Sequence, residues 1–164
     1  MNELFPREKY CFDSSAFIDN WRRYYWPANF PGLWKSIGEM MDGGIIICPE
    51  LVWQEIKDGD DDLTEWFENH LTAVIPMEGD QLNKVQELLS AFPKMADYNR
   101  PRPHHADPFV VALAEVKEIP VITMESGGDQ NNPKIPYVCT QRGAVPAKNF
   151  SRFISEQGWV FNQQ

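Results

Sequence analysis

Short apolar runs alternate along the chain with longer segments in which apolar residues recur every three or four positions. The short runs are rich in β-branched and aromatic side chains, which is typical of strands buried on both faces of a sheet. The longer segments have the period of amphipathic helices. The predicted strands are KYCF (9–12), IIIC (45–48), TAVI (72–75), VITM (121–124) and a short one near 144–147. The predicted helices cover 14–25, 31–42, 49–56, 61–71, 79–92, 107–119 and 149–157.

Proline and glycine residues between these segments support the same division into strands and helices. Pro27 and Pro31 interrupt the first helix, Gly43-Gly44 closes the second, and Pro120 stops the helix that begins at Asp107. The segment 93–106 is rich in proline and is expected to be a long surface loop. Strands that alternate with helices predict a parallel sheet covered on both faces. We therefore expect an α/β fold with three layers, α/β/α, around a central parallel sheet of four to five strands.

Composition narrows the class of protein. With 164 residues, 43% of them hydrophobic, the chain suits one compact domain over 1–164. Cysteines occur only at positions 11, 48 and 139, without a CxxC pair, which favours free thiols in a reducing compartment. The N-terminal residues lack the apolar stretch of a signal peptide, and no run is long enough to cross a membrane. These features predict a cytoplasmic protein without a membrane partner.

Net charge is −9, which at first argues against a nucleic-acid partner. The acids are concentrated, however: residues 55–80 contain nine of them and only Lys57 as a cation, a local balance of −8. The DGDDD cluster within this stretch (58–62) reads most simply as a solvated turn before a helix. Segments 20–38 and 130–164 on either side are mostly basic. Charge therefore excludes neither an RNA-binding protein nor any other class.

Four acids occupy positions where chemistry is expected. Asp13 directly follows the first strand, and Glu125 directly follows the fourth. Asp107 begins a helix before a proline, and Glu55 lies on a helix with apolar neighbours. Each has a simpler reading: Asp13 and Asp107 as helix caps, Glu55 as a surface residue and Glu125 as a turn residue. Because Ser14 and Ser15 also suit the cap position, Asp13 is expected to be partly free for another role.

These acids gain weight as a set. Residues that follow the strands of a parallel sheet meet at its carboxyl edge, where ligands of open α/β sheets bind. Carboxylates gathered there repel one another unless a cation lies between them. Oxygen ligands of this kind suit Mg²⁺ or Mn²⁺, which support hydrolysis of phosphate esters.

The stretches FDSSAFID, VWQEI, HADPFVVALA and VITME resemble the four motif regions of PIN-domain nucleases. RRYYWPANFPGLW, the Trp-Phe pair at 66–67 and KIPYVC resemble, more narrowly, a PIN-like family catalogued as domain of unknown function 4411. The resemblance covers nearly the whole chain. It implies metal ligation by Asp13, Glu55 and Asp107, with Glu125 in the fourth position and Ser14 as a supporting polar ligand.

The same resemblance implies a Mg²⁺- or Mn²⁺-dependent endoribonuclease that leaves 5′-phosphate and 3′-hydroxyl ends. Bacterial relatives of this fold are often toxins of toxin–antitoxin pairs, so an antitoxin protein is an expected partner besides RNA. Both a single chain and a homodimer are compatible with the sequence, which does not decide the oligomeric state. The alternative is a catalytically inactive PIN-like module that binds RNA or a protein. Retention of all four acids argues against it.

Other residues are less specific. Arg22 and Arg23 stand next to Tyr24, Tyr25 and Trp26, a mixture suited to contacting RNA, and Lys134 is a candidate phosphate contact. For each, an ordinary surface cation is the alternative. His104 and His105 suggest zinc, but adjacent histidines diverge and no cysteine lies at ligand spacing. A haloacid dehalogenase-type phosphotransferase would need an acid in place of Ser15. A receiver domain would need an aspartate where Pro76 and Met77 stand.

Overall fold

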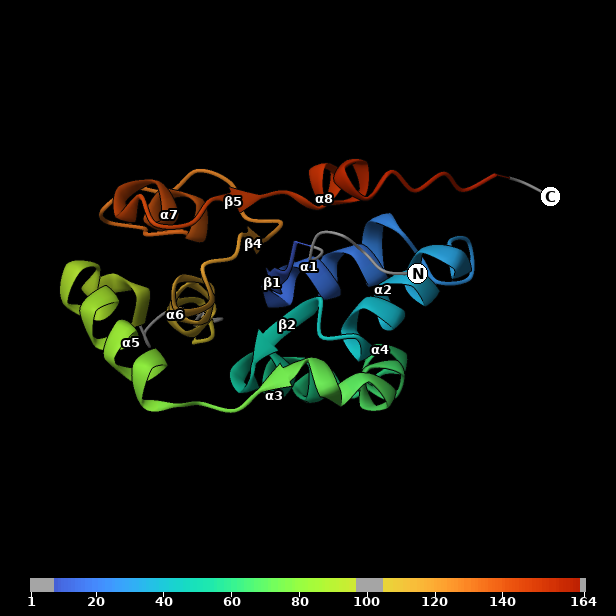
Figure 1. Cartoon of the computed structure of the whole chain (residues 1–164), viewed down its shortest axis with the longest axis horizontal. Coiled ribbons are helices and arrows are strands. Elements are labelled where there is room, and N and C mark those ends of the chain that lie inside the picture. Colours follow the sequence, from blue (N-terminus) through green and yellow to red (C-terminus); the bar gives the residue numbers. More distant parts are fainter. Residues whose placement is uncertain (1–7, 97–104, 163–164) are drawn as a thin grey trace.

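The computed structural model describes residues 8–96 and 105–162, and its centre is a five-stranded sheet (Figure 1). All pairings between neighbouring strands are parallel, and the strand order is β3-β2-β1-β4-β5. The strands are β1 (Tyr10–Phe12), β2 (Ile46–Pro49), β3 (Val74–Ile75), β4 (Val121–Ile122) and β5 (Ala147–Lys148). Each predicted strand is present, although each is shorter than or shifted from its apolar run.

Helices cover both faces of this sheet, which confirms the predicted three-layer α/β/α fold. In Figure 1, α5, α6 and α7 lie on one side of the sheet, and α2 and α8 on the other. The α-helices in the described residues are α1 (Ser14–Asp19), α2 (Pro31–Asp42), α3 (Glu50–Gly59), α4 (Asp62–Phe67), α5 (Gly79–Ala91), α6 (Asp107–Lys117), α7 (Ile135–Arg142) and α8 (Phe150–Gln157). None of them is long and apolar enough to cross a membrane.

The central strand β1 alternates its side chains between the two helical layers. The Cys11 thiol donates to the carbonyl oxygen of Val110 in α6 at 3.5 Å, so it faces one layer. Phe12 points the other way, with ring centroids 5.1 Å from both Phe17 in α1 and Phe153 in α8. Both β1 side chains are fully buried. Burial on both faces explains why this strand reads as a continuous apolar run.

Strand order reverses its direction at β1. The chain passes from β1 to β2 and β3 on one side, and β4 and β5 add on the other. Residues Cys11 and Phe12 pair with Val121 and Ile122, and the backbone N–H of Asp13 donates to the carbonyl of Ile122 at 2.9 Å. Because the connections leave β1 and β4 toward opposite sides of the sheet, the carboxyl ends of these two strands form its topological switch point, where ligands of open α/β sheets usually bind.

Several local predictions need correction. The first helix is α-helical only to Asp19 and continues as a π-helical segment, η1 (Asn20–Tyr24). The region after α4 becomes a 3₁₀ helix, η2 (Glu68–Ala73). Pro49 ends β2 and caps α3 instead of lying inside the helix. Of the expected loop 93–106, the first part forms a 3₁₀ turn, η3 (Pro93–Ala96), and 97–104 lie outside the described residues.

Helix α7 was not predicted, because its short sequence, IPYVCTQR, has little amphipathic periodicity. An ion pair links it to α6. The Glu115 side chain is only 2% exposed and accepts from Arg142 Nη2 at 2.7 Å and from Arg142 Nε at 2.9 Å. Bidentate pairing of this kind is geometrically specific, so it fixes α7 beside the helix that begins with Asp107.

Removing the Arg142 guanidinium should therefore destabilise the fold. We expect Arg142→Ala to lower the free energy of unfolding by about 3 kcal/mol, because the buried Glu115 carboxylate loses both short hydrogen bonds and keeps only the more distant Lys84, at 4.0 Å, as a cationic neighbour among the described residues. Urea denaturation measures the change. The matched control is Arg152→Ala, which breaks a surface i,i+4 pair with Glu156 and should cost less than about 1 kcal/mol. Equal losses in the two variants would show that the α6–α7 pair has no special weight.

Candidate metal centre

Three of the four predicted acids meet at the crevice between β1 and β4. One carboxylate oxygen from each of Asp13, Asp107 and Glu125 lies within 4.8 Å of the others. Asp13 and Asp107 are buried, with 3% and 5% of their surface exposed, and Glu125 is half-buried. The sheet supplies Asp13 and Glu125 from the ends of β1 and β4, and the first turn of α6 supplies Asp107. The expectation that these three acids share one edge is confirmed.

Asp13 is held by three hydrogen-bond donors. Its Oδ1 accepts from the backbone N–H of Ser14 at 2.8 Å, so Asp13 itself is the N-cap of α1. Its Oδ2 accepts from the hydroxyls of Ser15, at 2.7 Å, and Thr123, at 2.9 Å. The expectation that Ser14 and Ser15 would cap the helix in its place is wrong. Capping and a site role are therefore compatible, because an Asp13 oxygen still lies within 4.8 Å of oxygens of Asp107 and Glu125.

Ser15 and Thr123 tie the ends of β1 and β4 together. The Ser15 hydroxyl accepts from the backbone N–H of Met124 at 2.9 Å, and the Thr123 hydroxyl accepts from that of Glu125 at 3.0 Å. Thr123 is only 1% exposed. Sequence reasoning missed both residues. Their signal was a hydroxyl next to each strand-ending acid, but only the strand pairing brings residues 15 and 123 together.

The Asp107 carboxylate has an electrostatically unfavourable environment. Its pKa lies well above the usual range, first because burial penalises the charged form, and then because Asp13, Glu125 and Glu55 are negative neighbours. Hydrogen bonding with Glu125 raises it further. Asp107 is not a helix cap: Ala106 occupies the N-cap position of α6, and no side chain caps it. The simpler reading of Asp107 as a cap therefore does not hold.

Glu55 stands beside the three acids and is not one of them. Its Oε1 accepts from the backbone N–H of Ala106 at 3.2 Å, which joins α3 to the residue before Asp107. It is half-buried and is one of the charges that raise the pKa of Asp107. Glu125 is anchored in a similar way, since its Oε2 accepts from the N–H of Ile135, the first residue of α7, at 2.9 Å. Backbone donors thus orient the two outer carboxylates.

The chemistry of these donors fits a hard cation. The cluster presents carboxylate oxygens only, which suit Mg²⁺ or Mn²⁺ more than zinc. Ser14, the predicted supporting ligand, is 5% exposed, and its Oγ has no hydrogen-bond partner among the described residues. A buried hydroxyl without a partner costs about 1–3 kcal/mol. Close-set carboxylates and an unsatisfied oxygen beside them are both what a cation would relieve.

The histidines do not extend this cluster. His105 is half-buried and lies outside the set of three acids, and His104 falls outside the described residues. All three cysteines are buried and unpaired to one another. Among the described residues, no second group of three or more such side chains is arranged to hold a metal ion.

The predicted RNA-contacting cations have different surroundings. Arg22 donates from Nη2 and Nε to Oδ2 of Asp61, at 2.6 and 2.9 Å, and Asp61 is the N-cap residue of α4. Arg23 forms no ion pair among the described residues and borders an aromatic pocket of about 950 Å³. Lys134 is half-buried and directly precedes α7, whose first N–H binds Glu125. The acidic DGDDD segment is thus partly structural: Asp61 caps α4 and pairs with Arg22.

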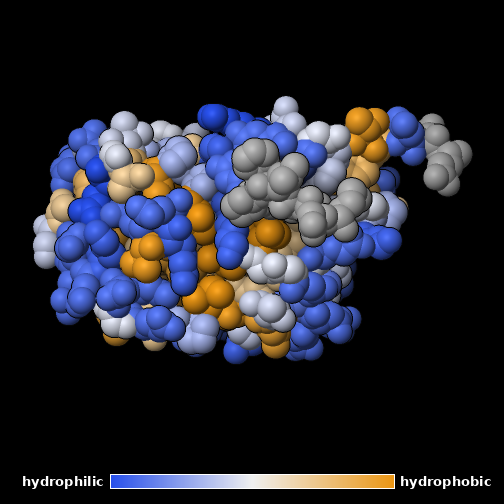
Figure 2. Space-filling model, in the orientation of Figure 1, coloured by the Kyte–Doolittle hydropathy of each residue, from blue (hydrophilic) through white to orange (hydrophobic). Residues whose placement is uncertain are grey.

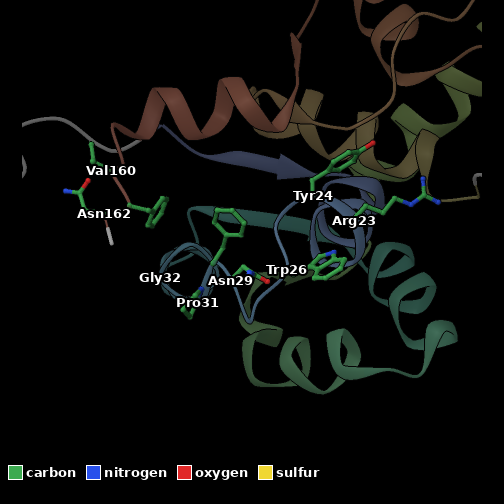
Figure 3. Close-up of a pocket in the computed structure, with 10 residues that line it drawn as sticks. Arg23, Tyr24, Trp26, Asn29, Pro31, Gly32, Val160 and Asn162 are labelled. Atoms are coloured by element: carbon green, nitrogen blue, oxygen red, sulfur yellow. The ribbon is translucent and has the colours of Figure 1, made fainter. Parts of the chain in front are cut away.

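The aromatic pocket gathers exposed apolar side chains from both ends of the sequence. Figure 3 shows Tyr24 and Trp26 on one side and Val160 and Asn162, from the C-terminal segment, on the other. Tyr24, Trp26 and Val160 are each more than half exposed. Figure 2 shows the C-terminal segment projecting from one end of the molecule, with hydrophobic atoms followed by hydrophilic ones. The pocket has no residue in common with the acidic cluster.

The fold and the cluster together define a three-layer α/β protein with a carboxylate site at its switch point. The chain belongs to the family described as Domain of unknown function (DUF4411), whose profile matches residues 10–161. The family resemblance read from the sequence is therefore confirmed at this level. No curated protein matches the chain.

The raised pKa of Asp107 predicts how the metal-free protein responds to pH. Because the native carboxyl holds its proton more tightly than the unfolded one, its stabilisation is present below the unfolded pKa and is lost as pH rises through the native pKa. Asp107→Asn removes this titration. In chelator, from about pH 5 to about pH 8, the variant should show a flatter stability profile and exceed wild type at the upper end.

Urea unfolding measures both profiles, and Asp80→Asn, at an exposed position, is the control. The control should keep the wild-type slope. A wild-type profile that does not fall with pH, or an Asp107→Asn profile that falls as steeply, would contradict the assignment of the conflict to Asp107.

Proposed function

We propose that this chain is a metal-dependent endoribonuclease of the PIN-like type. The observation that carries the proposal is the meeting of Asp13, Asp107 and Glu125 at the carboxyl edge between β1 and β4. Buried like charges are costly to fold, and a binding surface has no need of them. Three of the four motif stretches that resemble PIN nucleases supply these acids, and the fourth, VWQEI, supplies Glu55.

The chain's own residues would hold and orient the reacting groups. Asp13, Asp107 and Glu125 would bind Mg²⁺ or Mn²⁺, with Glu55 as the adjacent fourth carboxylate and Ser14 as a supporting oxygen. When bound, the ion supplies an acidified water and neutralises charge on the phosphate. Ser15 and Thr123 keep Asp13 in position, and the N–H groups of Ala106 and Ile135 keep Glu55 and Glu125 in position.

The proposed reaction is hydrolysis of one phosphodiester bond. The oxygen of water bonds to phosphorus and the bond from phosphorus to the 3′ oxygen breaks. The water proton released on attack ends on the 3′ oxygen. The products are a 5′-phosphate and a 3′-hydroxyl. Burial of Asp13 and Asp107 limits competing solvent around the phosphate and strengthens the electrostatic interactions within the site.

RNA contacts outside the acids are proposed to come from Arg23 and Lys134 more than from Arg22. The Arg22 guanidinium is already bound by Asp61, whereas Arg23 lies beside Tyr24 and Trp26, whose exposed rings can stack on bases. Lys134 is close in sequence to Ile135, which contacts Glu125. Arg22 is accordingly assigned a structural role between η1 and α4.

The biological setting follows from the resemblance alone. PIN-like relatives that act as toxins lead us to propose a toxin with an antitoxin partner in the cytoplasm, either as a single chain or as a homodimer. Three buried free thiols fit a reducing compartment. The second candidate function is an inactive module that binds RNA or protein, and the aromatic pocket is the feature that favours it.

Loss of either buried acid should abolish cleavage. With Mg²⁺ or Mn²⁺ and mixed RNA substrates, the wild type should cleave RNA, and Asp13→Asn and Asp107→Asn should each lower the cleavage rate more than about 100-fold. Loss of a residue that only supports a metal ligand lowers activity by at most about 100-fold. Gel or sequencing assays measure the rate. Asp80→Asn, at an exposed position, should retain full activity. A wild type that cuts no RNA favours the inactive module.

Substitutions of Thr123, Glu55 and Glu125 should lower the cleavage rate without abolishing it. Thr123→Val removes a donor to Asp13 without removing a carboxylate, and should lower activity roughly 10- to 100-fold. Thr140→Val is the control, because the Thr140 hydroxyl is exposed and binds only a carbonyl within α7. Glu55→Gln and Glu125→Gln should each fall below wild type. Full activity in either variant would remove that residue from the proposed ligand set.

A further inference from the structure

A cavity distinct from the aromatic pocket shares Glu55 with the proposed metal-binding residues, and the proposed function gives it no role. It has a volume of about 380 Å³, and its lining residues come from α3, α5, η3 and α6, with His105 just before α6. Glu55 belongs to its lining, and so does Pro108, the residue after Asp107. Glu55 also accepts from the N–H of Ala106, the residue before Asp107, so the cavity shares a residue with the surroundings of the carboxylate site.

The walls of this cavity are apolar, and its rim is polar. Leu51, Leu89 and Phe109 line it and are each half-buried, so they offer surface to a ligand without being closed off. Gln54 and Asp58 lie on the same face of α3 as Leu51 and Glu55, at helical spacings of three and four. Apolar walls with a few polar groups are usual for a small-molecule site of this volume.

The charges of the rim restrict what can enter. Two acids, Glu55 and Asp58, line the cavity together with one imidazole, that of His105, and no lysine or arginine lines it among the described residues. A phosphate would therefore be repelled, whereas a neutral planar ring with N–H donors would be accepted. The Gln54 side chain presents a donor and an acceptor, and it makes no hydrogen bond within the described residues. Amide side chains of this kind pair with a ring nitrogen and an adjacent amino group in nucleic acids.

We propose that the cavity binds the base of the nucleotide next to the scissile phosphate, and that it prefers bases with an exocyclic amino group over uracil. Adenine, cytosine and guanine each offer amino protons to Asp58 and Gln54. Uracil has no exocyclic amino group: it offers the single proton of N3–H, and the two carbonyl oxygens beside it face the carboxylate oxygens. The position next to the cut rests on the proposed nuclease function, but base binding itself does not. The cavity would thus set where along an RNA this site acts.

Free nucleosides test base binding without metal or phosphate. Adenosine, cytidine, guanosine and uridine are titrated separately into the full-length protein in chelator, and leucine methyl signals are followed by NMR. We expect the Leu51 and Leu89 methyl groups to shift with the three amino-bearing nucleosides, and uridine to bind roughly tenfold more weakly or less. Asp58→Asn should narrow this difference, because an amide offers a donor to the uracil carbonyl.

Leu89→Trp fills the cavity and should abolish nucleoside binding. Its matched control is Leu82→Trp, one leucine changed on the same helix at an exposed position that does not line the cavity. In RNA cleavage, Leu89→Trp should raise KM and flatten the base preference read from the sequenced product ends. Leu82→Trp should change neither.

The outcomes separate this proposal from the nuclease. Cleavage by a wild type that binds no nucleoside, or binding that survives Leu89→Trp, overturns the base site and leaves the nuclease standing. Equal binding of uridine overturns the preference. If the wild type binds nucleosides, Leu89→Trp abolishes that binding and the wild type cuts no RNA, the base site is supported and the nuclease function is overturned.

Discussion

Buried negative charge at the edge of the sheet is the constraint on which the site depends. Asp13 is balanced by the N–H of Ser14 and the hydroxyls of Ser15 and Thr123, so its charge is solvated by the protein itself. Asp107 is buried beside Asp13, Glu125 and Glu55, and both its burial and their negative charges raise its pKa. A site built in this way stores electrostatic energy that a proton or a divalent cation can release. The surrounding hydrogen bonds act to keep the acids together against that repulsion.

The surfaces beside the site suggest how an acidic protein can contact RNA. A chain with net charge −9 gains little from general attraction to phosphates. The two hollows that we propose for RNA bases are the aromatic pocket at Tyr24 and Trp26 and the apolar cavity at Leu51 and Leu89. Both suit neutral bases. Recognition of this kind would depend on stacking and base edges more than on ionic strength.

The sequence determined the fold class and the candidate acids. Apolar runs such as IIIC and VITM identify buried strands because a strand covered on both faces excludes polar side chains. Helices between them require parallel pairing, and parallel pairing places Asp13 and Glu125 at the same edge. Local pattern was less informative for α7, which has weak periodicity, and for the π-helical continuation of α1. Those elements depend on contacts with distant residues, such as Glu115 with Arg142.

Tertiary structure alone decided how the acids are arranged and what supports them. The order β3-β2-β1-β4-β5 makes β1 and β4 neighbours, which brings Thr123 to Asp13 across 110 residues of sequence, beside the local Ser15 donor. It also places Glu55 to one side, between the three acids and the cavity. It further distinguishes Arg22, paired with Asp61, from its neighbour Arg23. A sequence pattern reports which residues face the core or a sheet edge, but distances between segments follow only from how the layers pack.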